Sequence, residues 1–122
     1  MERIKENKER EHRIAMEVVV DAYGEIERAM GWYCYLEDNL VFPFKARCGV
    51  KRATSPLKIG EEVQVMAMAP EEECGSEIFV WIERGGEKFA VPLAQLESAS
   101  SNPETQEAVA DWRYWVARGY QF

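Results

Sequence analysis

Seven glutamates and no lysine or arginine occur between residues 59 and 83, and their charge equals the net charge of −7 of the whole 122-residue chain. Four of these carboxylates lie within one short stretch, between two segments that read as β-strands. They are Glu71, Glu72, Glu73 and Glu77. Carboxylate oxygens are suitable ligands for hard cations such as Ca²⁺. This segment would form part of a cation site if folding brings a second oxygen-rich loop against it.

Such a second segment occurs earlier in the chain, where Glu37, Asp38 and Asn39 stand between two leucines in an expected turn. Asp38 is the best single candidate ligand, because its short side chain is flanked by two further oxygen donors. The spacing does not match an EF-hand loop, which has Gly at its sixth position and Glu at its twelfth. A cation site would therefore be assembled by tertiary folding. The alternative is that both segments are solvated loop charges, which is the usual role of charge runs.

Other site chemistries find less support in the residue types and their spacing. Cys34, Cys48, Cys74 and His12 are formally four zinc ligands, but no pair has the short spacing of structural zinc sites. His12 is the single histidine and lies far in sequence from every cysteine, so no nucleophile–base pair is indicated. We therefore expect a protein that is not an enzyme.

The composition limits the class of protein further. A sequence pI near 4.8 disfavours nucleic acid, because attraction to phosphate supplies most non-specific affinity. No apolar run approaches the roughly 20 residues that span a bilayer, so no membrane role is expected. Three widely spaced cysteines and no apolar leader after the first methionine favour a reduced, cytoplasmic protein. At 47% hydrophobic residues, the chain has enough apolar material for one globular domain.

Two helices are expected, one at each end of the domain. Apolar residues recur at helical spacing in the first 31 residues, which predicts an amphipathic helix ending near Gly31. This stripe consists of Ile14, Val18, Ala22, Ile26 and Ala29. Asn102 followed by Pro103 is a helix-start signal and predicts a second helix over residues 102–119. Trp112 and Trp115 share a face of that helix and should pack against the rest of the domain.

Residues 32–97 read as short strands. Apolar and polar residues alternate over 42–48 and 62–69, and a hairpin is expected where 78–83 meets 87–91 across Gly85 and Gly86. Residues 92–96 should form a short helical turn that closes the sheet. Closure removes exposed sheet edges. The sequence thus predicts an α+β fold: an N-terminal amphipathic helix (1–31), a small SH3-like antiparallel β-barrel (32–97) and a C-terminal helix (102–119).

Several of these segments together resemble the CcbP-type calcium-binding proteins. The resemblance rests on the aromatic-Leu-Glu-Asp-Asn-Leu string in residues 31–40, the Phe-Pro-Phe of 42–44, and segments 57–61, 73–74 and 91–96. The C-terminal residues are also similar to longer members with a helical extension. The resemblance implies calcium binding by acidic groups on a small β-rich domain without EF-hands, with a part in calcium buffering or signalling in some members. It implies that the ligand regions are 37–39 and 71–73 with Glu77.

A different function class remains open at this point. Trp32, Tyr33, Tyr35, Phe79 and Trp81 could line a groove on the barrel and bind a protein partner. In that hypothesis the acidic loop would be an electrostatic recognition patch for a basic partner. An interaction module of this kind would expose Trp32 or Trp81, whereas a calcium-binding protein would use them in its core.

Overall fold

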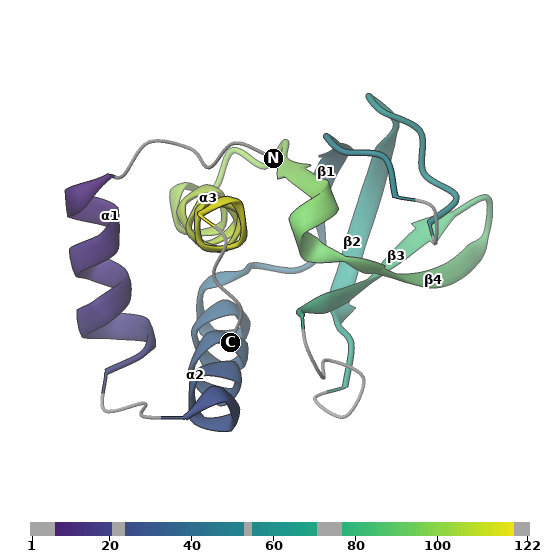
Figure 1. The fold of residues 1–122 in the computed structure, drawn as a ribbon. Coiled ribbons are helices and arrows are strands. Elements are labelled where there is room, and N and C mark those ends of the chain that lie inside the picture. The colour runs from purple at the N-terminus through teal and green to yellow at the C-terminus, as the bar shows by residue number, and fades with distance from the viewer. Residues whose placement is uncertain (1–6, 21–23, 53–54, 71–76, 119–122) are drawn as a thin grey trace.

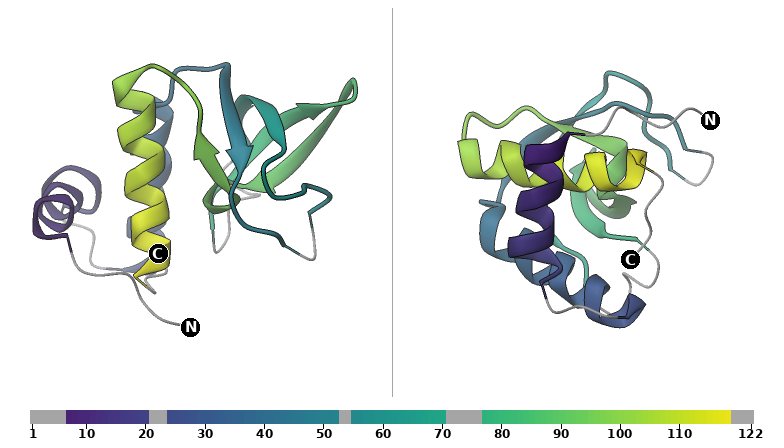
Figure 2. Two further views of the ribbon diagram at one scale, coloured as in Figure 1. Left: turned by 90° about the horizontal axis from the view of Figure 1, so that it is seen from above. Right: turned by 60° about the vertical axis from the view of Figure 1, so that its left-hand side comes forward.

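Helices and strands lie in separate layers in the computed structural model, which describes residues 7–20, 24–52, 55–70 and 77–118 (Figure 1). The helical elements are α1 (Lys8–Arg13), the π-helical turn η1 (Ile14–Val18), α2 (Glu25–Asn39), the 3-10 turn η3 (Leu93–Gln95) and α3 (Pro103–Ala117). The strands are β1 (Phe44–Cys48), β2 (Glu62–Met68), β3 (Phe79–Arg84), β4 (Glu87–Pro92) and β5 (Leu96–Ser98). Helices α2 and α3 lie between α1 and the sheet (Figure 2).

The five strands form one antiparallel sheet in the order β4-β3-β2-β1-β5. The expected alternation is confirmed in β1, where Phe44, Ala46 and Cys48 are buried and the two residues between them are exposed. No ladder joins β4 to β5 among the described residues, so the sheet is open and the SH3-like barrel is not confirmed. The physical reason is that helices cover the apolar face, and Leu36 of α2 and Val109 of α3 are buried in one core with the strands.

The hairpin between β3 and β4 is confirmed. Arg84 pairs with Glu87, which leaves a two-residue turn at Gly85 and Gly86. Both glycines have positive φ angles, 59° and 83°. Positive φ at both central positions is the requirement of the tight turn that best matches the twist of two antiparallel strands.

The prediction of one continuous N-terminal helix ending at Gly31 was wrong. Helix α1 passes into η1, which ends at Val18, and α2 then begins at Glu25 and runs through Gly31 to Asn39. The expected apolar stripe is split accordingly: Ile14 and Val18 are buried, whereas the Ile26 side chain is 78% exposed. Ala22, a further member of that stripe, lies outside the described residues.

Gly31 has a packing role within α2. A Cβ atom at this position would lie 2.4 Å from the backbone carbonyl oxygen of Val18. The end of η1 therefore approaches the backbone of α2 at a point where only glycine fits. A glycine that terminates a helix and one that admits a close neighbour look alike in sequence, and here the second role applies.

The start of α3 and its tryptophan packing are confirmed. The Asn102 side chain accepts a hydrogen bond from the Thr105 amide at 2.9 Å, and proline follows at the first helical position. Trp32 of α2 is fully buried, with its ring centroid 5.0 Å from that of Trp112 and 5.5 Å from that of Trp115. The core therefore includes Trp32, whereas the other members of the aromatic-groove hypothesis are half-buried, namely Tyr33, Tyr35, Phe79 and Trp81.

None of the helices in the described segments combines the length and the apolar character needed to cross a bilayer.

Candidate cation-binding site

The last turn of α2 carries three of the predicted ligands. Glu37 and Asp38 are exposed, and Asn39 is half-buried and donates from Nδ2 to the Tyr35 carbonyl oxygen at 2.8 Å. These residues were expected in a turn, but the structure places them in the helix. A helix C-terminus has a partial negative charge and carbonyl groups without intrahelical partners. Two carboxylates at this end therefore create a local potential that favours a cation.

Asp38 and Asn39 line an open cleft of about 480 Å³ between α2 and η1. Glu17 of η1 lies on the opposite side of this cleft and adds a carboxylate that the sequence did not indicate. Glu17 faces α2 only because η1 and α2 are separate elements that pack side by side. The prediction of one continuous N-terminal helix therefore could not place Glu17 near Asp38. Glu37 does not line this cleft.

Glu37 lies on a different side of α2 and is exposed. It follows Tyr33 by four residues and thus shares its face of α2, about 100° around the helix from Asp38. The Tyr33 hydroxyl donates to the Ala69 carbonyl oxygen at 2.9 Å, where the chain leaves the end of β2. The Ala69 amide in turn donates to the Phe79 carbonyl at 3.0 Å, which closes the base of the β2–β3 connection. Helix α2 therefore contacts the chain two residues before the acidic segment 71–77 begins.

Glu71, Glu72 and Glu73 lie outside the described residues, and Glu77 is the described member of the acidic segment. Its Oε2 accepts from Nη2 of Arg52 at 2.6 Å, and both side chains are partly buried. Glu77 is thus held by an arginine, and a metal ion would have to displace that arginine to bind it.

Within the described ranges, no group of three or more His, Cys, Asp and Glu side chains could hold a metal ion. Glu37, Asp38, Asn39 and Glu77 therefore do not make a complete metal site by themselves. Cys34 is exposed and Cys48 is buried, and neither forms a disulfide. The residues that the structure describes therefore include no group of ligands that supports the zinc hypothesis.

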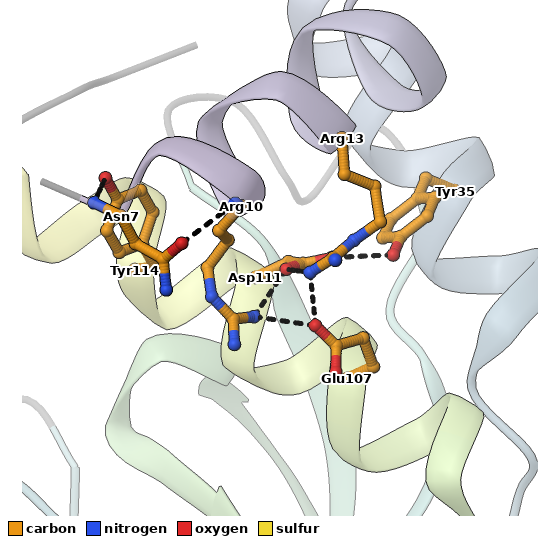
Figure 3. Close-up of polar contacts among 7 residues, drawn as sticks. All are labelled: Asn7, Arg10, Arg13, Tyr35, Glu107, Asp111 and Tyr114. Atoms are coloured by element: carbon orange, nitrogen blue, oxygen red, sulfur yellow. Dashed lines mark hydrogen bonds and ion pairs between the residues drawn. The ribbon is translucent and has the colours of Figure 1, made fainter.

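The buried carboxylate of Asp111 links the helices α1, α2 and α3 (Figure 3). Asp111 of α3 is fully buried and accepts from Arg10 and Arg13 of α1, each at 2.5 Å, and from the Tyr35 hydroxyl of α2 at 2.7 Å. Arg10 and Arg13 also contact the half-exposed Glu107 one turn earlier on α3. Sequence reasoning missed this network, which fixes α1 and α2 against α3.

The surroundings of Tyr35 favour its neutral, protonated form. Burial raises the pKa of the Tyr35 hydroxyl well above its usual range, and the hydrogen bond to Asp111 raises this pKa further. The protonated hydroxyl can therefore remain a donor to Asp111. Tyr35 precedes Asp38 by three residues, so the bond anchors the part of α2 from which the candidate ligands extend.

The arrangement defines a class: a small α+β protein with an open antiparallel sheet, two covering helices, and exposed carboxylates suited to a hard cation. The profile of the CcbP family, described as calcium binding, matches residues 12–116. The chain belongs to this family of calcium-binding proteins.

Two solved structures are similar over the full length of both chains. One is described as "The crystal structure of Anabaena CcbP", with a TM-score of 0.86 and 41% sequence identity. The other is described as "Calcium binding protein in the calcium-binding form", with a TM-score of 0.85 and 40% identity. No curated protein sequence matches the chain.

Proposed function

We propose that this chain binds Ca²⁺ through carboxylates of the last turn of α2 and of the acidic segment 71–77. The observation that carries the proposal is the 40% identity, over both full chains, to a protein described as being in its calcium-binding form. The proposed ligands are Glu37, Asp38, Asn39, Glu71, Glu72, Glu73 and Glu77. A buffering or signalling role in the cytoplasm is part of the same proposal.

The geometry of α2 supports this choice of ligands. The two carboxylates are at the negative end of a helix dipole, where bound positive charge is favoured. Tyr33, one turn before Glu37, contacts the residue that precedes the acidic segment by two positions. Calcium accepts six to eight oxygens in flexible geometry, whereas magnesium requires a stricter octahedron. A site built from a helix end and a neighbouring segment therefore suits calcium better than magnesium.

We expect Asp38→Asn to weaken calcium binding by roughly tenfold, since one charged oxygen ligand is replaced by a neutral one, a loss of about 1.4 kcal/mol. The measurement is isothermal titration calorimetry with Ca²⁺, in the presence of excess Mg²⁺ and near-physiological salt. Glu83→Gln is the matched control, because Glu83 is an exposed carboxylate on β3 and lies outside the proposed ligand set. The variant removes the same charge from the chain and should leave the affinity unchanged.

Equal weakening by Asp38→Asn and Glu83→Gln would show that calcium responds only to the net charge of the protein. An absence of saturable heat with the unaltered chain would contradict calcium binding itself. Glu37→Gln separates the two sides of α2, because Glu37 and Asp38 point in different directions. If only one of these variants weakens binding, the ion sits on that side of the helix.

A further inference from the structure

A second cavity lies between α3, η3 and the segment that follows β1. Its volume is about 510 Å³, within the range of small-molecule sites. Most of its wall is apolar and comes from small side chains, so the described residues leave this space open. The apolar lining residues are Val50, Ala94, Ala110, Val116 and Ala117.

Three arginines from three different segments line the same cavity. They are Arg10 of α1, Arg52 after β1 and Arg113 of α3. Their convergence is notable in a chain whose net charge is −7. Of the proposed calcium ligands that the structure describes, none lines this cavity.

Each arginine is held in place by a carboxylate through one guanidinium nitrogen. Arg10 Nη1 lies 2.5 Å from Asp111, Arg52 Nη2 lies 2.6 Å from Glu77, and Arg113 Nη2 lies 3.6 Å from Glu97. Figure 3 shows this arrangement for Arg10. A guanidinium carries five N–H donors in a planar fork that matches a carboxylate. Arg10 and Arg52 are therefore oriented by hydrogen bonds, whereas Arg113 forms a longer ion pair. All three guanidinium groups retain donors for a further anion.

We propose that this cavity binds a small amphipathic carboxylate, with its apolar body on α3 and η3 and its carboxylate at the arginines. The wall accounts for the apolar body, because burial of apolar surface against alanine and valine is favourable. The arginines account for the single negative charge, since hydrogen bonds to charged groups are the stronger kind. A ligand with only the apolar body would leave the arginines without a bound anion, and a ligand with only the carboxylate would leave the apolar wall uncovered. Either ligand should therefore bind more weakly than one with both features.

Octanoate is the probe for the test, because it has one carboxylate and one short apolar chain. Binding is followed by amide chemical shifts in two-dimensional NMR spectra of the full chain, with and without Ca²⁺. We expect saturable shifts at Ala94, Ala110 and Arg113. We expect Arg113→Gln to weaken the affinity by roughly tenfold, as loss of a charged hydrogen bond would. Arg47→Gln, on the exposed side of β1, should leave the affinity unchanged.

Ala110→Leu fills the cavity and should abolish the saturable shifts, and Ala117→Leu is a second variant should the first fail to fold. Octanol at equal concentration should bind at least roughly tenfold more weakly, and inorganic phosphate should not compete. The proposal is overturned if octanoate does not bind, or if its shifts map to another face. It is also overturned if octanol binds equally, if phosphate displaces octanoate, or if the filled cavity binds as before.

Discussion

Replacing Asp111 by alanine is expected to lower the free energy of unfolding by about 3–5 kcal/mol. The Asp111 side chain is fully buried and accepts from two guanidinium groups and one hydroxyl. Alanine would leave Arg10 and Arg13 partly buried without their main counter-charge, and a buried charge without a partner is costly. Urea denaturation, with the midpoint and slope both fitted, measures the change.

Glu107→Gln provides the matched control for this prediction. Glu107 contacts the same two arginines from the same helix, but its side chain is 46% exposed, so solvent screens the interaction. We expect the control to change the free energy of unfolding by about 1 kcal/mol or less. If both variants destabilise the chain equally, the arginines are held by general charge attraction and burial of Asp111 is not decisive.

Gly31→Ala is expected to destabilise the chain by about 2 kcal/mol, against the preference of helices for alanine. In an unobstructed helix this substitution would stabilise by roughly 1 kcal/mol. Here the new Cβ would lie 2.4 Å from the Val18 carbonyl oxygen, a backbone atom that can move only if η1 moves with it. Overpacking of this kind costs about 1–3 kcal/mol or more, and the contact is short enough to place the cost at the upper end.

Thermal or urea unfolding again measures the effect, and amide shifts of Ile14–Val18 report whether η1 has moved away from α2. Gly24→Ala is the control, because a Cβ there meets nothing within 4 Å. Its effect should stay below about 1 kcal/mol, the scale of a changed N-cap. Stabilisation by Gly31→Ala would mean that η1 does not pack against α2 in solution.

Local signals predicted the elements that depend on local geometry. The Gly85–Gly86 turn requires positive φ, and Asn102 with Pro103 satisfies the needs of a helix start, so both follow from a few adjacent residues. Gly31 could not be assigned correctly, because its role depends on Val18 being folded back against it. The sequence could not show that the sheet stays open. The sheet is open because α2 and α3 cover its apolar face, and that packing is visible only in the folded structure.

The candidate site was predictable in a similar, partial way. The oxygen-rich residue types at Glu37, Asp38 and Asn39 identified a segment that the structure presents at a helix end. Glu17 carried no signal, since it is one charged residue in a heavily charged segment. The sequence carried a weak signal for Asp111. Glu107 and Asp111 are four residues apart, and Arg10 and Arg13 are three residues apart, so each pair lies on one face of its helix. Only folding shows that the two faces meet.

The docking of α1 sets an order for the synthesis of this protein. Arg10 and Asp111 are separated by 101 positions, and Arg13 and Glu107 by 94. During translation, residues 7–18 therefore emerge long before their charged partners on α3 exist. A six-residue helix is marginal in water without packing. Helix α1 can therefore form these ion pairs only after residue 111 has been added and α3 can form, so its docking is a late step in the assembly of the domain.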